Sequence, residues 1–107
     1  MTFHDYQILA RRTQNPQLTP RERLEHATWG LCAEVGEVCA LHQKKHQGHI
    51  LNQASVLDEL SDCLWFIAEL CDVYGFNLDE VAEHNIAKLR SRYKGGFTVK
   101  ESVNRTE

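Results

Sequence analysis

Two pairs of carboxylates are the residues of this chain best placed to do chemistry. Each pair has a spacing of three positions, and residues three apart lie on the same face of an α-helix. Two such pairs facing each other form a group of oxygen ligands, which hard divalent cations such as Mg2+ prefer. A carboxylate that holds no metal is available to orient or deprotonate an attacking water. The four residues are Glu34, Glu37, Glu59 and Asp62.

The first pair is expected on a long helix that begins near residue 20. Thr19 to Glu22 combines an N-cap threonine, a proline at the first helical position and a glutamate that completes a capping box. An apolar row with steps of three and four continues from there, so the helix is expected to reach about Lys45. A shorter helix is expected ahead of it, from about Phe3 to Thr13.

The second pair is expected on a central helix from about Ser55, its predicted N-cap, to Tyr74. Gly75 is expected to end it, and Asn77 to cap a last helix that runs to about Tyr93. The central helix is apolar around most of its circumference, which predicts cover on several sides. Its solvent-facing row is expected to be Asp58, Glu69 and Asp72.

Both pairs border apolar rows. Glu34 and Glu37 share a row with the small residues Gly30 and Ala33, and Glu59 falls on a row with Cys63 and Phe66. Carboxylates gathered beside buried surface repel one another, and a divalent cation is the natural counter-charge. The last helix carries Asn85, Lys88 and Arg92 on one face, which suits phosphate binding or simply a helix C-terminus.

The whole chain is predicted to be all-α, most simply a four-helix bundle over residues 1–97 with a polar tail over 98–107. With 107 residues and a net charge of −3, it has neither a general basic footprint for nucleic acid nor an apolar run that could span a membrane. No signal peptide is visible, so a cytoplasmic location is expected. So much apolar surface in a short chain favours a homodimer or a larger homo-oligomer.

Other polar and aromatic residues have two possible roles. The three histidines at one helix end suit a transition metal or, more simply, solvent. The four cysteines are expected to be reduced and buried. The two tryptophans suit stacking on a base or a place in the core. Base binding is predicted, from position alone, for Trp29, Tyr6 and His4. The histidines are His42, His46 and His49, and the cysteines are Cys32, Cys39, Cys63 and Cys71.

Three blocks in order resemble the MazG-like family of all-α nucleoside triphosphate pyrophosphohydrolases. They are Ala33 to Val38, Leu57 to Asp62 and Asn85 to Tyr93, within a region of similarity from Gly30 to Phe97. The resemblance implies a helical bundle assembled as dimers or tetramers, Mg2+ as cofactor with Mn2+ as its substitute, and hydrolysis of an NTP or dNTP to the monophosphate and pyrophosphate.

The resemblance also implies roles for individual residues. Glu34, Glu37, Glu59 and Asp62 are expected to bind the metal, with Glu37 and Glu59 essential for catalysis. Lys88 and Arg92 are expected to contact phosphates, with Asn85 at the border of the site. The chain has Ala33 where the family often has a further glutamate, and Lys94 where it often has proline. The expected role is house-cleaning or control of nucleotide pools, with deoxynucleotides as the favoured substrates.

Three alternatives remain open. A phosphoribosyl-ATP pyrophosphatase has the same architecture. A ferritin-like di-iron bundle requires Glu-x-x-His pairs, which neither carboxylate pair supplies. A non-catalytic module that binds nucleotides or a partner needs no such complete set of carboxylates.

Overall fold

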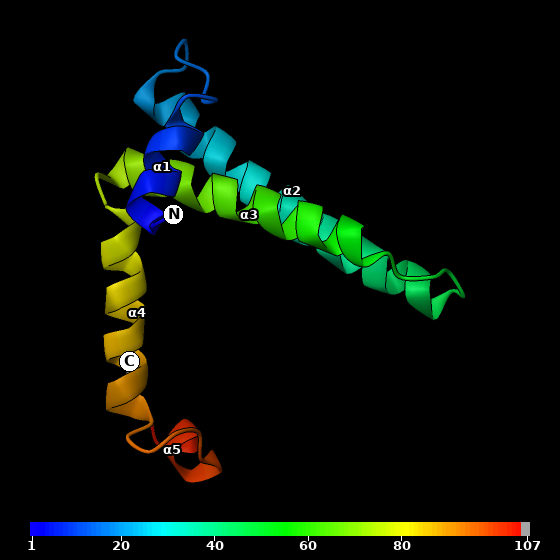
Figure 1. Ribbon diagram of the computed structural model, residues 1–107, viewed down its shortest axis with the longest axis vertical. Coiled ribbons are helices and arrows are strands. Elements are labelled where there is room, and N and C mark those ends of the chain that lie inside the picture. The colour runs from blue at the N-terminus through cyan, green and yellow to red at the C-terminus, as the bar shows by residue number, and fades with distance from the viewer. Residues whose placement is uncertain (106–107) are drawn as a thin grey trace.

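The computed structural model describes residues 1–105 and contains five helices in that range (Figure 1). They are α1 (Phe3–Arg11), α2 (Pro20–His46), α3 (Gln53–Tyr74), α4 (Leu78–Arg92) and α5 (Val99–Val103). The all-α class is thus confirmed. Among residues 1–105, no helix is both long and apolar enough to cross a membrane.

The helix ends follow from local residues, with one correction. Thr19 and Asn77 each form the expected capping box with a glutamate three positions on, and Gly75 ends α3 at a φ of 75°. The predicted N-cap at Ser55 is wrong. The helix starts earlier because the Asn52 side chain accepts a hydrogen bond from the backbone of Ala54, and asparagine caps a helix as well as serine does.

The segment expected as a polar tail contains the short helix α5. Thr98 caps it by accepting a hydrogen bond from the backbone N–H of Glu101, and the Glu101 carboxylate accepts one from the backbone of Lys94. The helix was missed because five residues leave no periodic pattern to detect. The last two positions of the predicted tail, Thr106 and Glu107, lie outside the described residues.

The helices are arranged as a hairpin and a diverging arm. Helices α2 and α3 run side by side along their lengths, while α4 leaves the end of α3 in another direction (Figure 1). Within residues 1–105, α4 packs against α1 but along neither α2 nor α3. One chain therefore does not close the predicted four-helix bundle.

A small core holds the junction of α1, α3 and α4 together. Ala68, Cys71 and Leu78 are buried there, and Tyr6 and Ile67 pack against them. Elsewhere, large apolar side chains of α3 and α4 remain exposed, including Leu57 at 69% and Leu60 at 53%, so the predicted cover of the central helix is absent in the single chain. Cys32 and Cys39 are also exposed, contrary to expectation.

Asp72 of α3 anchors α1, although the sequence suggested that it faces solvent. Its carboxylate, 5% exposed, accepts hydrogen bonds from Arg11 at 2.8 Å, Gln7 at 2.7 Å and Gln14 at 2.8 Å. The Gln7 side chain also accepts one from the backbone N–H of Leu78. Burial alone would raise the pKa of Asp72, but these donors outweigh it and lower the pKa.

We expect Asp72→Asn to lower the free energy of unfolding by about 1.5–3 kcal/mol at pH 7, because the variant leaves charge-assisted donors unmatched. A lowered folded-state pKa stabilises the fold above the unfolded value and loses that effect as the pH falls through the folded value. The deficit should therefore shrink below about pH 4. Denaturant unfolding at pH 7 and pH 3 measures it, with the exposed Asp58→Asn as control. A deficit equal at both pH values would contradict this account.

Candidate metal centre

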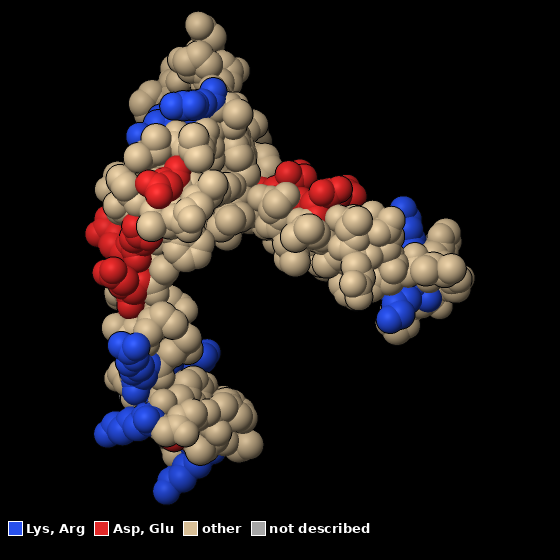
Figure 2. Space-filling model, in the orientation of Figure 1, with Lys and Arg blue, Asp and Glu red and all other residues tan. Residues whose placement is uncertain are grey.

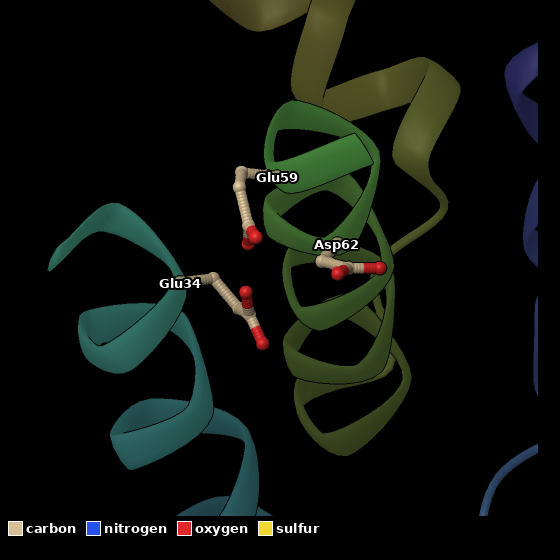
Figure 3. A group of neighbouring side chains, drawn as sticks. All are labelled: Glu34, Glu59 and Asp62. Atoms are coloured by element: carbon tan, nitrogen blue, oxygen red, sulfur yellow. The ribbon is translucent and has the colours of Figure 1, made fainter. Parts of the chain in front are cut away.

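Three of the four predicted carboxylates meet where α2 faces α3. Glu34 of α2 and Glu59 of α3 point toward each other, and Asp62 leaves the next turn of α3 beside them (Figure 3). Each offers a ligand oxygen, and these atoms all lie within 4.8 Å of one another. Glu34 and Glu59 are half-buried and Asp62 is exposed, so the group is open to solvent on one side.

The electrostatics of this group show mutual repulsion. A hydrogen bond with Glu34 raises the pKa of Glu59, and burial and the charges of Glu34, Asp62 and Asp58 raise it further. Burial and the charges of Glu34, Glu59 and Asp62 also raise the pKa of the neighbouring Cys63 thiol. Carboxylates gathered in this way repel one another, and a divalent cation can neutralise their negative charge. Hard oxygen donors at this spacing fit Mg2+ better than a soft metal.

The approach of α2 to α3 depends on a glycine one turn before Glu34. A methyl group on Gly30 would collide with the ring of Phe66, whereas one on Gly36 would meet no atom within 4 Å. The small residue thus lets the Phe66 ring lie against the backbone of α2. This close packing brings Glu34 within reach of Glu59.

Other predicted site residues lie outside the group of three. Glu37 is exposed one turn beyond Glu34 on α2. Asn85, Lys88 and Arg92 lie on α4, which diverges from the hairpin (Figure 1). Figure 2 shows acidic side chains midway along the α2–α3 arm and basic ones over the far part of α4 and around α5. A single chain therefore separates the acidic group from the predicted phosphate-binding residues.

The three residues predicted to bind a base are not brought together. Tyr6 lines an apolar cavity of about 460 Å3 with Phe3 and Leu64, and burial and the charge of Asp62 raise its pKa. His4 bonds the Asn77 side chain at 3.1 Å, at the start of α4. Trp29 is 68% exposed on α2, and it lines neither the cavity beside Tyr6 nor the one beside His4.

Sequence reasoning missed one pair near the carboxylates, in which a buried glutamate meets a half-exposed histidine. Glu69, predicted to face solvent, is 1% exposed, and one of its oxygens lies 2.8 Å from Nδ1 of His26. The two residues are 43 positions apart. The sequence did contain a signal for this position. Glu69 is spaced by steps of three and four from Glu59, Asp62 and Phe66, so it lies on the same face of α3 as the two carboxylates, two turns further on.

Comparison with known proteins places the chain in a family. The family model of the MazG nucleotide pyrophosphohydrolase domain matches residues 23–97, which include all four carboxylates and the cations of α4. The chain is similar to the Gene 37 protein of Mycobacterium phage L5, at 30% identity over 89 residues and 78% of each chain. No solved structure gives a significant match. The chain belongs to the family of MazG nucleotide pyrophosphohydrolase domains.

Proposed function

We propose that this protein hydrolyses a nucleoside triphosphate to the monophosphate and pyrophosphate in a reaction that depends on Mg2+, which Mn2+ can replace. The observation that carries the proposal is the meeting of Glu34, Glu59 and Asp62 within a MazG domain. The reaction breaks the anhydride bridge between the α- and β-phosphates and adds water across it. A role in clearing or adjusting nucleotide pools follows from this chemistry, with deoxynucleotides as the favoured substrates.

The carboxylates divide into two proposed roles. Glu34, Glu59 and Asp62 hold the cation, because their ligand atoms lie within 4.8 Å of one another and can coordinate the same ion. When bound, the cation supplies the positive charge that the phosphate oxygens and the attacking water require. Glu37 is exposed and outside this group, so it is free to take the proton from the attacking water. Because Glu37 lies one helical turn from Glu34, binding the metal as a fourth ligand is its alternative role.

The cations of α4 are proposed to reach the phosphates from a second copy of the chain. Lys88 and Arg92, with Asn85 beside them, diverge from their own acidic group. The negative charge that builds up on a polyphosphate in transfer reactions needs such cations. In the proposed assembly, the α4 helix of the second copy lies against the acidic group.

The exposed surface supports such an assembly. The chain exposes 8156 Å2, against about 6,100 Å2 for a compact monomer of its mass. Its radius of gyration is 17.0 Å, against about 13 Å for a compact domain of this length. Burial of this excess surface between copies fits a homodimer or homotetramer. Ile86 and Leu89 of α4, 45% and 38% exposed, are part of the apolar surface available for such an interface.

The proposal is tested by pyrophosphate release from a panel of NTPs, dNTPs and phosphoribosyl-ATP, with Mg2+ and with a chelator. We expect release from one or more nucleoside triphosphates only when the metal is present. Release from phosphoribosyl-ATP alone would assign the chain to the histidine-pathway reaction. A folded, oligomeric protein that releases pyrophosphate from none of them would overturn the proposal.

A further inference from the structure

The pair His26–Glu69 lies in the contact between α2 and α3 and takes no part in the proposed metal centre. Glu69 is 1% exposed, while the side chain of His26 is 48% exposed. Apolar residues of similar volume often serve a helix contact as well as a buried carboxylate does, or better. Helix packing alone therefore gives no reason for a carboxylate here.

Glu69 determines the tautomer and the orientation of the His26 ring. An ionised carboxylate only accepts hydrogen bonds, so the Nδ1 of His26, 2.8 Å away, is the donor. In the neutral imidazole this leaves Nε2 as an acceptor. Half of the side chain is exposed, and no partner for Nε2 is found among residues 1–105. In this tautomer, Nε2 is the acceptor of a half-exposed ring that the contact with Glu69 holds in place.

Aromatic rings surround this acceptor. The His26 ring lies 5.5 Å from that of Phe66, at a tilt of 55°, and 6.3 Å from that of Trp65, edge to face. Trp65 is held in turn by a hydrogen bond from its indole N–H to Thr13 at 2.8 Å. Aromatic side chains beside a few oriented polar atoms are a typical lining of sites that bind small organic molecules.

The position of the pair relates it to the metal centre. His26 precedes Glu34 by eight positions, and Glu69 follows Asp62 by seven, which places the pair about 10–12 Å along the helices. Phe66 lies between, on the same row of α3. A nucleotide whose phosphates lie at the carboxylates can extend its sugar and base over Phe66 to His26. Tyr6 instead packs against the core of Ala68, Cys71 and Leu78, and it lines a cavity with Leu64.

We propose that His26 determines substrate specificity by accepting a hydrogen bond from the nucleoside part of the substrate, and that Glu69 is its positioning residue. This inference rests on the proposed function, since it requires phosphates at the carboxylates. The donor is an amino or imino group of the base or a hydroxyl of the sugar. Either donor loses its partner when Nε2 is removed.

The test compares kcat and KM of His26→Ala and His26→Gln with those of the wild type. We expect the alanine variant to raise KM for the preferred nucleotide about 10–100-fold, with a smaller change in kcat, because one oriented hydrogen bond is lost. Glutamine offers an oxygen acceptor and should restore part of the loss. It also serves if the alanine variant does not fold. Loss of discrimination among bases assigns the contact to the base, and loss of discrimination between deoxy- and dideoxynucleotides assigns it to the sugar.

The chain offers a matched control in His42. His42 lies eight positions after Glu34 on α2, and His26 lies eight positions before it. The Nδ1 of His42 lies 3.0 Å from the carbonyl oxygen of Val38. We expect His42→Ala to keep wild-type KM. Glu69→Gln should raise KM in the wild type but add nothing to His26→Ala, because it acts through the histidine.

Two failures are distinguishable. A wild type that hydrolyses nucleotides, with His26→Ala and His42→Ala indistinguishable from it, overturns the role of His26 and leaves the proposed function intact. A wild type that hydrolyses no nucleotide overturns the proposed function and this inference together.

Discussion

Replacement of Glu59 by glutamine is expected to reduce turnover by about 10²–10⁴-fold while leaving the fold intact. The variant keeps the shape of the side chain but removes one of the three charges that gather between α2 and α3. Its loss weakens the site for a divalent cation. Steady-state turnover as a function of Mg2+ concentration measures the effect, and the Mg2+ concentration for half-maximal rate should rise.

The same substitution that lowers turnover should leave the stability of the metal-free fold unchanged or raise it. The raised pKa of Glu59 means that the folded state resists its ionisation, so this residue destabilises the metal-free fold as the pH rises above the unfolded pKa of the group. Glutamine removes that repulsion, and metal-free Glu59→Gln should melt at the same or a higher temperature than the wild type. Asp58→Asn makes the same change of charge outside the group and should keep wild-type turnover. Equal turnover in both variants and the wild type would rule out the assigned metal centre.

Glu37→Gln separates the two proposed roles. Because Glu37 lies outside the group of three, this variant should lower kcat while the Mg2+ dependence changes little. A large shift in Mg2+ dependence would instead make Glu37 a fourth ligand.

Mixed oligomers of two inactive variants are expected to recover activity. We expect Lys88→Ala to be strongly impaired, since it removes a cation from the phosphates. If the cation comes from the partner, a dimer of one Glu59→Gln chain and one Lys88→Ala chain contains one doubly defective site and one intact site. Such a dimer should have about half of wild-type activity for a symmetric pair of sites. Chains with two different affinity tags, co-expressed and purified on both tags, provide the sample.

A second pair of variants is the control for this experiment. Glu59→Gln and Asp62→Asn both change the acidic group, which one chain supplies, so every site in their mixed dimer keeps one defect. No recovery is expected there. Equal recovery in both mixtures, or none in either, would contradict a shared site and place Lys88 with its own chain's carboxylates or outside the site.

Sequence predicted the parts of this molecule that depend on neighbouring residues. Thr19 and Asn77 cap helices because their side chains bond backbone groups only three positions away or fewer. The spacing of Glu59 and Asp62 places them on one face in any helix, so their nearness follows from the helical period alone. The meeting with Glu34 required α2 to pack against α3, which the apolar rows of both helices indicated.

Features that depend on distant partners were not predictable in the same way. Glu69 and Asp72 share a row with the solvated Asp58. Their burial is tolerable because His26 of α2 bonds Glu69, and because Arg11, Gln7 and Gln14 donate hydrogen bonds to Asp72. The direction of α4 was also missed, because an amphipathic pattern shows that a face needs cover but not which chain supplies it. The same limit explains the exposed Trp29, whose sequence context fits a core or a surface equally well.

Metal-dependent cleavage between the α- and β-phosphates can be followed by 31P NMR of the products that the purified protein forms from a deoxynucleoside triphosphate in the presence of Mg2+. We expect resonances of the monophosphate and of pyrophosphate in equal amounts, and no products when a chelator removes the metal or when Glu59→Gln replaces the wild type. Diphosphate with inorganic phosphate, or products that form equally well with the chelator, would contradict the proposed reaction.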